Sequence, residues 1–115
     1  MNIDNIKSQM RKGMLEFCIL LIIRKQPVYA SELIAMLKEA HLIVVEGTLY
    51  PLLTRLKNDG LLSYVWQEST AGPPRKYYSL TDDGQRALDM LADCWNDMAG
   101  AVDHLRQTHL PNPND

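Results

Sequence analysis

The sequence predicts a mainly α-helical fold with one small β-hairpin. Three observations support this prediction. Apolar residues recur at helical spacing along most of the chain, two segments rich in aromatic and aliphatic residues flank one turn that contains glycine and proline, and the last third carries a single long apolar stripe. With 115 residues, of which 46% are hydrophobic, the chain can form one small domain with a modest core.

Two helices are expected in the first third of the chain. The first should cover residues 4–24, because the run FCILLII in its second half is apolar almost all round, as in a central core helix. Gln26-Pro27 should end it. The second helix should start near residues 29–31, with Ser31 as the N-cap, and bury Leu33, Ile34 and Leu37.

A third helix is expected over residues 46–58. Its leucines recur at i, i+3, i+4 and i+7, and Asp59-Gly60 follows as a C-terminal signal. Pro51 lies within this repeat, although a proline in a helix interior costs about 3 kcal/mol. We expect Pro51 to lie close to the first turn, where backbone N–H groups lack helical partners and the cost is small.

A hairpin and a fourth helix complete the predicted order. Residues 61–68 and 75–80 have strand-forming composition, and residues 69–74, STAGPP, form the turn between them. Thr81 should cap a long helix that runs to about residue 107, with Asp82 and Asp83 in its first turn, where negative charge suits the helix dipole.

This order of elements predicts a winged helix-turn-helix with an additional C-terminal helix. We therefore expect three parts: a DNA-binding domain over residues 1–80, a dimerisation helix over residues 81–107 and a flexible tail over residues 108–115.

The outward face of the third helix is the candidate reader of DNA. A helix of 3.6 residues per turn places Gly47, Pro51, Thr54 and Asn58 opposite the leucines, with Thr48, Tyr50 and Arg55 on the flanks. This face is slim at its N-terminal end, which suits insertion into a major groove. Arg75 and Lys76, next to the expected turn, suit phosphate contacts. The predicted DNA-binding residues are Thr48, Tyr50, Pro51, Thr54, Arg55, Arg75 and Lys76.

The alternative is that these residues form only a solvated helix face and a charge pair on an edge strand. Charge gives evidence on both sides. The formal net charge is −2, which does not favour nucleic acid. However, residues 1–80 contain ten Lys/Arg and seven Asp/Glu (+3), and residues 81–115 contain two and seven (−5). A basic front and an acidic rear are compatible with a DNA reader that carries a separate assembly helix.

Two blocks of sequence resemble the PadR family of bacterial transcriptional regulators. They are GTLYPLLTRLKNDGLL and GPPRKYYSLTDDGQRAL, and the similarity extends over about residues 14–88. The chain departs from the family pattern at Ala30-Ser31, where Gly-Tyr is common, and at Gly72-Pro73-Pro74, where Gly-Arg-Pro is common; the missing arginine weakens one expected phosphate contact of the wing. The resemblance implies a repressor that binds a pseudo-palindromic operator on double-stranded DNA as a homodimer.

The fourth helix carries an apolar stripe with alternating spacings of three and four residues, which predicts helix pairing. Its members are Leu88, Leu91, Trp95, Met98, Val102 and Leu105. A second copy of the chain is the natural partner. The resemblance also implies that aromatic residues on this helix can line a slot for flat, hydrophobic effectors, which here would use Trp95 and Met98. The alternative is that Trp95 only fills the dimer interface.

Other functions find little support in the sequence. The histidines, His41, His104 and His109, lack metal-ligand spacing, and no catalytic set or cofactor-binding loop occurs. We therefore expect no enzyme activity, cofactor or metal. The FCILLII run is much shorter than the ~20 residues that span a bilayer, and we expect a cytoplasmic protein without membrane contact. The competing hypothesis is a winged-helix module that binds another protein instead of DNA.

Overall fold

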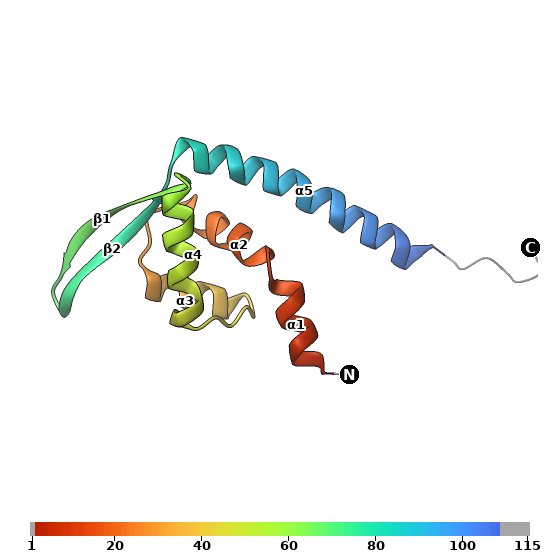
Figure 1. Cartoon of the computed structure of the whole chain (residues 1–115), viewed down its shortest axis with the longest axis horizontal. Coiled ribbons are helices and arrows are strands. Elements are labelled where there is room, and N and C mark those ends of the chain that lie inside the picture. The colour runs from red at the N-terminus through yellow and green to blue at the C-terminus, as the bar shows by residue number, and fades with distance from the viewer. Residues whose placement is uncertain (1, 109–115) are drawn as a thin grey trace, which may run out of the picture.

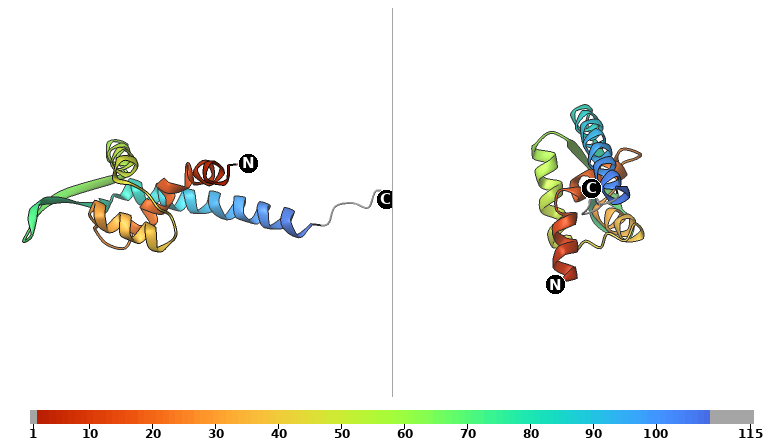
Figure 2. Two further views of the ribbon diagram at one scale, coloured as in Figure 1. Left: turned by 90° about the horizontal axis from the view of Figure 1, so that it is seen from below. Right: turned by 90° about the vertical axis from the view of Figure 1, so that its right-hand side faces the viewer.

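The computed structural model describes residues 2–108 and shows five helices and one two-stranded antiparallel sheet (Figure 1). Helices α2, α3 and α4 gather around one core, and the hairpin and α5 project from opposite sides of it (Figure 2). The expected tail lies outside the described residues except for Thr108. The elements are α1 (Ile3–Arg11), α2 (Met14–Ile23), α3 (Ala30–Glu39), α4 (Glu46–Asn58), β1 (Leu62–Ser69), β2 (Gly72–Leu80) and α5 (Asp82–Gln107).

The prediction of one helix over residues 4–24 was wrong. The helix is interrupted at Gly13, which separates α1 from α2. Gly13 has a φ of 87°, a left-handed conformation that glycine adopts without steric cost. Nothing lies within 4 Å of where a Cβ would stand, so the backbone angle alone explains the glycine. Helix α1 buries none of its residues, and its Ile3 and Met10 are exposed.

Helix α3 begins one residue before the expected cap. Tyr29, not Ser31, is the N-cap residue, and its backbone N–H donates to Oε1 of Glu32 at 3.2 Å. Ser31 lies inside the first turn and is exposed. The Glu32 carboxylate thus satisfies the backbone N–H of the N-cap residue, and the N–H of Glu32 donates to the Tyr29 carbonyl at 3.0 Å, so the helix starts without a serine cap.

Helix α4 has the predicted bounds, but Pro51 lies deeper in it than expected. The helix starts at Glu46, so Pro51 is in its second turn and cannot donate to the carbonyl of Gly47. The packing of the opposite face outweighs this loss. Leu49, Leu53 and Leu56 are almost completely buried, and burying them contributes roughly 5–9 kcal/mol together, compared with about 3 kcal/mol for an interior proline.

The hairpin forms the predicted wing, with a tighter turn than the sequence suggested. Strand β2 begins at Gly72, so Pro73 and Pro74 belong to the strand near its tip, and the pairing is irregular between Gln67 and Ser69. The other end of the wing is tied to the helical core. Tyr78 and Val28 exchange backbone hydrogen bonds of 2.8 and 3.1 Å, and both side chains are buried.

The start of α5 is fixed by a cap and by a close approach. The Thr81 hydroxyl accepts from the N–H of Gly84 at 2.9 Å and donates to the carbonyl of Gly60 at 2.6 Å. A Cβ on Gly84 would lie 2.1 Å from the carbonyl oxygen of Leu61 and 2.7 Å from the side chain of Leu80. Only glycine therefore allows α5 to lie this close to the base of the wing.

Gly84→Ala should consequently destabilise the protein. The added methyl meets a backbone carbonyl that cannot rotate away, and overpacking of this kind typically costs about 1–3 kcal/mol. Thermal denaturation followed by circular dichroism should show a melting temperature several degrees lower. Gly100→Ala, in the same helix but facing open space, is the matched control and should be neutral or stabilising. Equal melting temperatures for the two variants would contradict this account.

Candidate nucleic-acid interface

The outward face of α4 carries the residues expected to contact DNA. Pro51 and Thr54 are exposed opposite the buried leucines, Thr48 and Arg55 are exposed on one flank, and Tyr50 is 47% exposed on the other. This face is therefore open to a partner, except that Arg55 pairs with Glu16 of α2.

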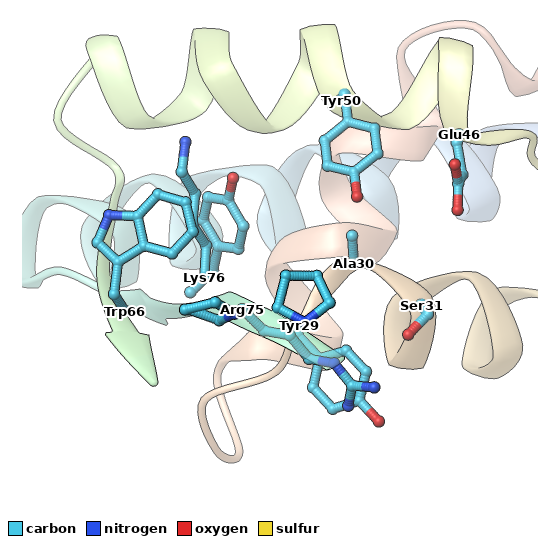
Figure 3. Close-up of a pocket in the computed structure, with 11 residues that line it drawn as sticks. Tyr29, Ala30, Ser31, Glu46, Tyr50, Trp66, Arg75 and Lys76 are labelled. Atoms are coloured by element: carbon cyan, nitrogen blue, oxygen red, sulfur yellow. The ribbon is translucent and has the colours of Figure 1, made fainter. Parts of the chain in front are cut away.

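A groove between α4 and the wing brings the first set of predicted residues together (Figure 3). We call it the wing groove. Its volume is about 450 Å³, and Tyr50 lines it together with Arg75 and Lys76. Tyr50 points from α4 toward the wing, and the Lys76 side chain extends from the wing toward α4 (Figure 3). Segments 25 residues apart in sequence thus form one surface.

The two wing cations lie on opposite faces of the hairpin, because adjacent strand residues alternate. The Arg75 guanidinium lies 4.4 Å from the ring centroid of Tyr29, and the Lys76 ammonium lies 4.5 Å from that of Tyr64 and 5.3 Å from that of Trp66. Cation–π contacts contribute about 0.5–1 kcal/mol at exposed sites. They hold both cations along the wing and leave their hydrogen-bond donors available.

A second groove lies on the other flank of α4, against the corner between α1 and α2. We call it the corner groove. Its volume is about 700 Å³, and Thr48, Pro51 and Arg55 line it. Arg55 forms an ion pair with Glu16 of α2 there. Of the predicted DNA-binding residues, only Thr54 lines neither groove.

Sequence reasoning missed the residues that α1 and α2 contribute to this second groove. Arg11, Lys12 and Glu16 line it, although they lie at least 30 residues before α4. The sequence Arg11-Lys12-Gly13 could have indicated this groove. Glycine is common just after the end of a helix, and the change of chain direction there can bring the two preceding cations next to another element. Trp66, on β1, is 61% exposed on the wing.

The titratable groups near the interface show no arrangement for acid–base chemistry. Burial raises the pKa of Tyr78, with smaller contributions from Tyr50 and Tyr64, so its phenol stays neutral at physiological pH. Burial likewise raises the pKa of the Cys18 thiol, which keeps it protonated and unreactive. Within residues 2–108, no group of three or more metal-ligating side chains comes together.

The predicted stripe on α5 divides into a buried and an exposed part. Leu88 belongs to the core of its own domain, and Leu91 is half-buried against the same core. Trp95 is 40% exposed, with its ring centroid 6.4 Å from that of Phe17 on α2. The remaining members are each more than half exposed, and we call Trp95, Met98, Val102 and Leu105 the exposed stripe. No helix in the described part of the chain is long and apolar enough to cross a bilayer.

Comparison with known proteins identifies the family. The sequence model of the transcriptional regulator PadR-like family matches residues 19–90, which include the core, α4, the wing and the start of α5. The chain belongs to the PadR-like family. It is therefore a winged-helix DNA-binding transcriptional regulator, and members of this family are not enzymes.

Solved structures of PadR-like regulators agree with this assignment. A PadR-like transcription factor from Bacteroides fragilis is 64% identical, with a TM-score of 0.74, and the alignment covers 88% of this chain and 98% of the other. A PadR family regulator from Eggerthella lenta is 32% identical, with a TM-score of 0.83 and coverage of 93% and 94%. One from Bacillus cereus is 39% identical, with a TM-score of 0.78 and coverage of 88% and 99%. Among curated proteins, no sequence matches this chain significantly.

Gly47 provides a test that separates folding from DNA contact on the outward face of α4. Nothing lies within 4 Å of a Cβ placed there, so the fold does not require glycine at this position. Gly47→Ala should stabilise the helix by up to about 1 kcal/mol, and the added methyl should weaken binding to duplex DNA several-fold. Gly100→Ala on α5 is the control, which should gain stability and keep its affinity. A Gly47 variant that is more stable and binds DNA unchanged would show that this face does not approach DNA.

Proposed function

We propose that this regulator is a homodimeric repressor that binds a pseudo-palindromic operator in the cytoplasm and responds to a small aromatic effector. The observation that carries the proposal is the division of exposed residues. A slim, polar face of α4 lies beside the cations of the wing. An exposed apolar stripe lies on α5, which projects from the other side of the core.

In this proposal α4 enters the major groove with its N-terminal half leading. Gly47 and Pro51 keep this half slim, and Thr48, Tyr50 and Thr54 offer hydroxyl groups to base edges or phosphates. Arg55 adds a phosphate contact from the flank. A hydroxyl group can donate or accept a hydrogen bond, so each of these side chains can pair with either a donor or an acceptor on a base edge.

The wing contacts the DNA backbone beside this groove. Arg75 and Lys76 are placed by their aromatic neighbours, so little side-chain freedom is lost when a phosphate binds. Such contacts fix the register of the domain on the duplex and supply affinity that does not depend on sequence. In this scheme the base-specific part of recognition comes from α4.

Dimerisation pairs the exposed stripe with that of a second copy. The stripe continues beyond the point where α5 leaves α2, so its own domain cannot cover Met98, Val102 and Leu105. The exposed Ile3 and Met10 of α1 supply a further apolar surface for the same assembly. A symmetric pair of winged domains would read two half-sites about one helical turn, ~34–36 Å, apart.

Trp95 is the candidate contact for the effector. Its indole is partly exposed next to Phe17, and Met98 follows one turn later. Two such sets related by a two-fold axis would give a flat, apolar slot with adaptable walls. An effector in this slot would alter the separation of the two wings and thereby lower operator affinity. The alternative is that the two tryptophans only pack in the interface.

A protein-binding module is the second candidate function, since winged helices serve both purposes. It is favoured by the acidic segment 81–115, whose balance of two cations against seven carboxylates opposes contact with DNA. The salt dependence of binding separates the two candidates. Release of counterions makes DNA affinity fall steeply between 50 and 200 mM salt, whereas a protein that does not use phosphate contacts would show no such binding to random duplexes.

The dimer can be tested on the exposed stripe without disturbing the core. Val102→Asp places a charge in the proposed interface, and sedimentation velocity should show monomers in place of dimers. Asn96→Asp introduces the same charge off the stripe and should leave the dimer intact. A Val102→Asp protein that sediments like the wild type would place the interface elsewhere on the chain.

The effector site can be tested by fluorescence. In a Trp66→Phe background, Trp95 is the only indole, and its emission should be quenched when a planar aromatic cation stacks in the slot. The same compound should lower operator affinity in the background protein. Trp95→Leu in the unmodified chain should abolish the effect on DNA. Unchanged emission and unchanged affinity across a panel of planar dyes would leave Trp95 with a packing role only.

A further inference from the structure

The corner groove gathers positive charge beside the recognition helix. Among the residues that line it, three are cations (Arg11, Lys12 and Arg55), and only Glu16 is a carboxylate. Arg11 has one weak contact within its own helix, a 3.4 Å hydrogen bond to Ser8, and Lys12 is exposed. These cations come from segments that are far apart in sequence, and the break at Gly13 brings them together.

The two grooves lie on the two flanks of α4. Tyr50 lines the wing groove, whereas Thr48 and Pro51 line the corner groove. Seen from below, α1 and α4 lie on the same side of the molecule (Figure 2). The major groove is about 12 Å wide and is bounded by a phosphate strand on each side. A helix inserted in it therefore faces phosphates on both flanks.

We propose that the corner groove is a second surface for the DNA backbone, and that Glu16 sets how strongly it binds. This inference rests on the proposed insertion of α4 into DNA. The wing contacts one phosphate strand, and Arg11, Lys12 and Arg55 contact the opposite strand. Each winged domain thereby grips the duplex on both sides of α4.

Glu16 acts as a counter-charge for Arg55 in this arrangement. Their side chains are 32% and 55% exposed, so the ion pair lies in water-accessible surroundings and holds only weakly. A phosphate of the backbone can replace the carboxylate as the partner of the guanidinium. The carboxylate nevertheless competes with DNA at every sequence, and it therefore limits binding that does not depend on sequence.

The first test removes the two cations of the α1–α2 corner. Arg11→Gln/Lys12→Gln should weaken binding to a random 24-base-pair duplex, measured by fluorescence anisotropy between 50 and 200 mM salt. The plot of log K against log salt should lose about 0.9 of slope for each phosphate contact removed, about two per DNA-bound protomer. Arg24→Gln/Lys25→Gln changes the charge equally at the other end of α2, outside both grooves, and should retain the wild-type slope.

The second test concerns Glu16. Glu16→Gln should raise the affinity for random duplex several-fold, because the phosphate that binds Arg55 no longer has to displace a carboxylate. The gain should vanish in an Arg55→Gln background. Asp93→Asn on α5, which removes the same charge from an exposed position, should give little or no gain.

Several outcomes would overturn the inference. They are an unchanged slope for Arg11→Gln/Lys12→Gln, a loss of affinity for Glu16→Gln, or a gain that persists without Arg55. A change of sedimentation in the Arg11/Lys12 variant, without a change in slope, would assign the groove to a second copy of the chain and would also refute it. If Gly47→Ala weakens binding while these variants bind as the wild type does, the inference fails and α4 remains the reader.

Discussion

The arrangement of the DNA-facing surface depends on the burial of one leucine face. Leu49, Leu53 and Leu56 hold α4 in the shared core, where α3 and β1 are its main neighbours, and their packing determines which residues of α4 point outward. The same packing lets the helix tolerate Pro51 in its second turn, where the proline keeps the outward face narrow. Loss of this contact would remove both the recognition face and the two grooves beside it.

Helix α2 lies between the two functional ends of the molecule. Consecutive residues in its first turns contact them: Glu16 pairs with Arg55 on α4, and Phe17 packs against Trp95 on α5. Gly13 precedes this turn and has a conformation that a helix cannot continue through. Neighbouring residues of α2 therefore contact both the recognition helix and the helix that carries the exposed stripe.

Much of the fold follows from local sequence patterns. The leucine repeat gave the bounds of α4, Thr81 gave the start of α5, and aromatic composition placed both strands to within a few residues. The break at Gly13 did not follow, because the apolar pattern continues across it and a single glycine does not prove a helix end. The cap of α3 was misplaced because the backbone N–H of Tyr29 donates to the Glu32 carboxylate, a contact that does not require a serine at the cap.

The site was less accessible to sequence reasoning than the fold. The exposure of Arg75 and of the outward residues of α4 could be predicted, because spacing along one element is sufficient to place them; their contact with DNA stays a prediction. The corner groove was missed, since it depends on how α1 turns back toward α4. The role of Leu88 also depends on tertiary packing: a regular spacing placed it in the dimer stripe, whereas it lies in the core of its own domain.

The central claim is that the outward face of α4 reads DNA sequence, and selection from random duplexes tests it most directly. The wild-type protein should enrich one pseudo-palindrome with half-sites about one helical turn apart. Tyr50→Ala, with its melting temperature unchanged, should enrich no sequence or a different one, since Tyr50 points outward and supports no core contact of the leucine face. Enrichment of the same operator with the same affinity by Tyr50→Ala, Thr48→Ala and Thr54→Ala proteins would contradict the account.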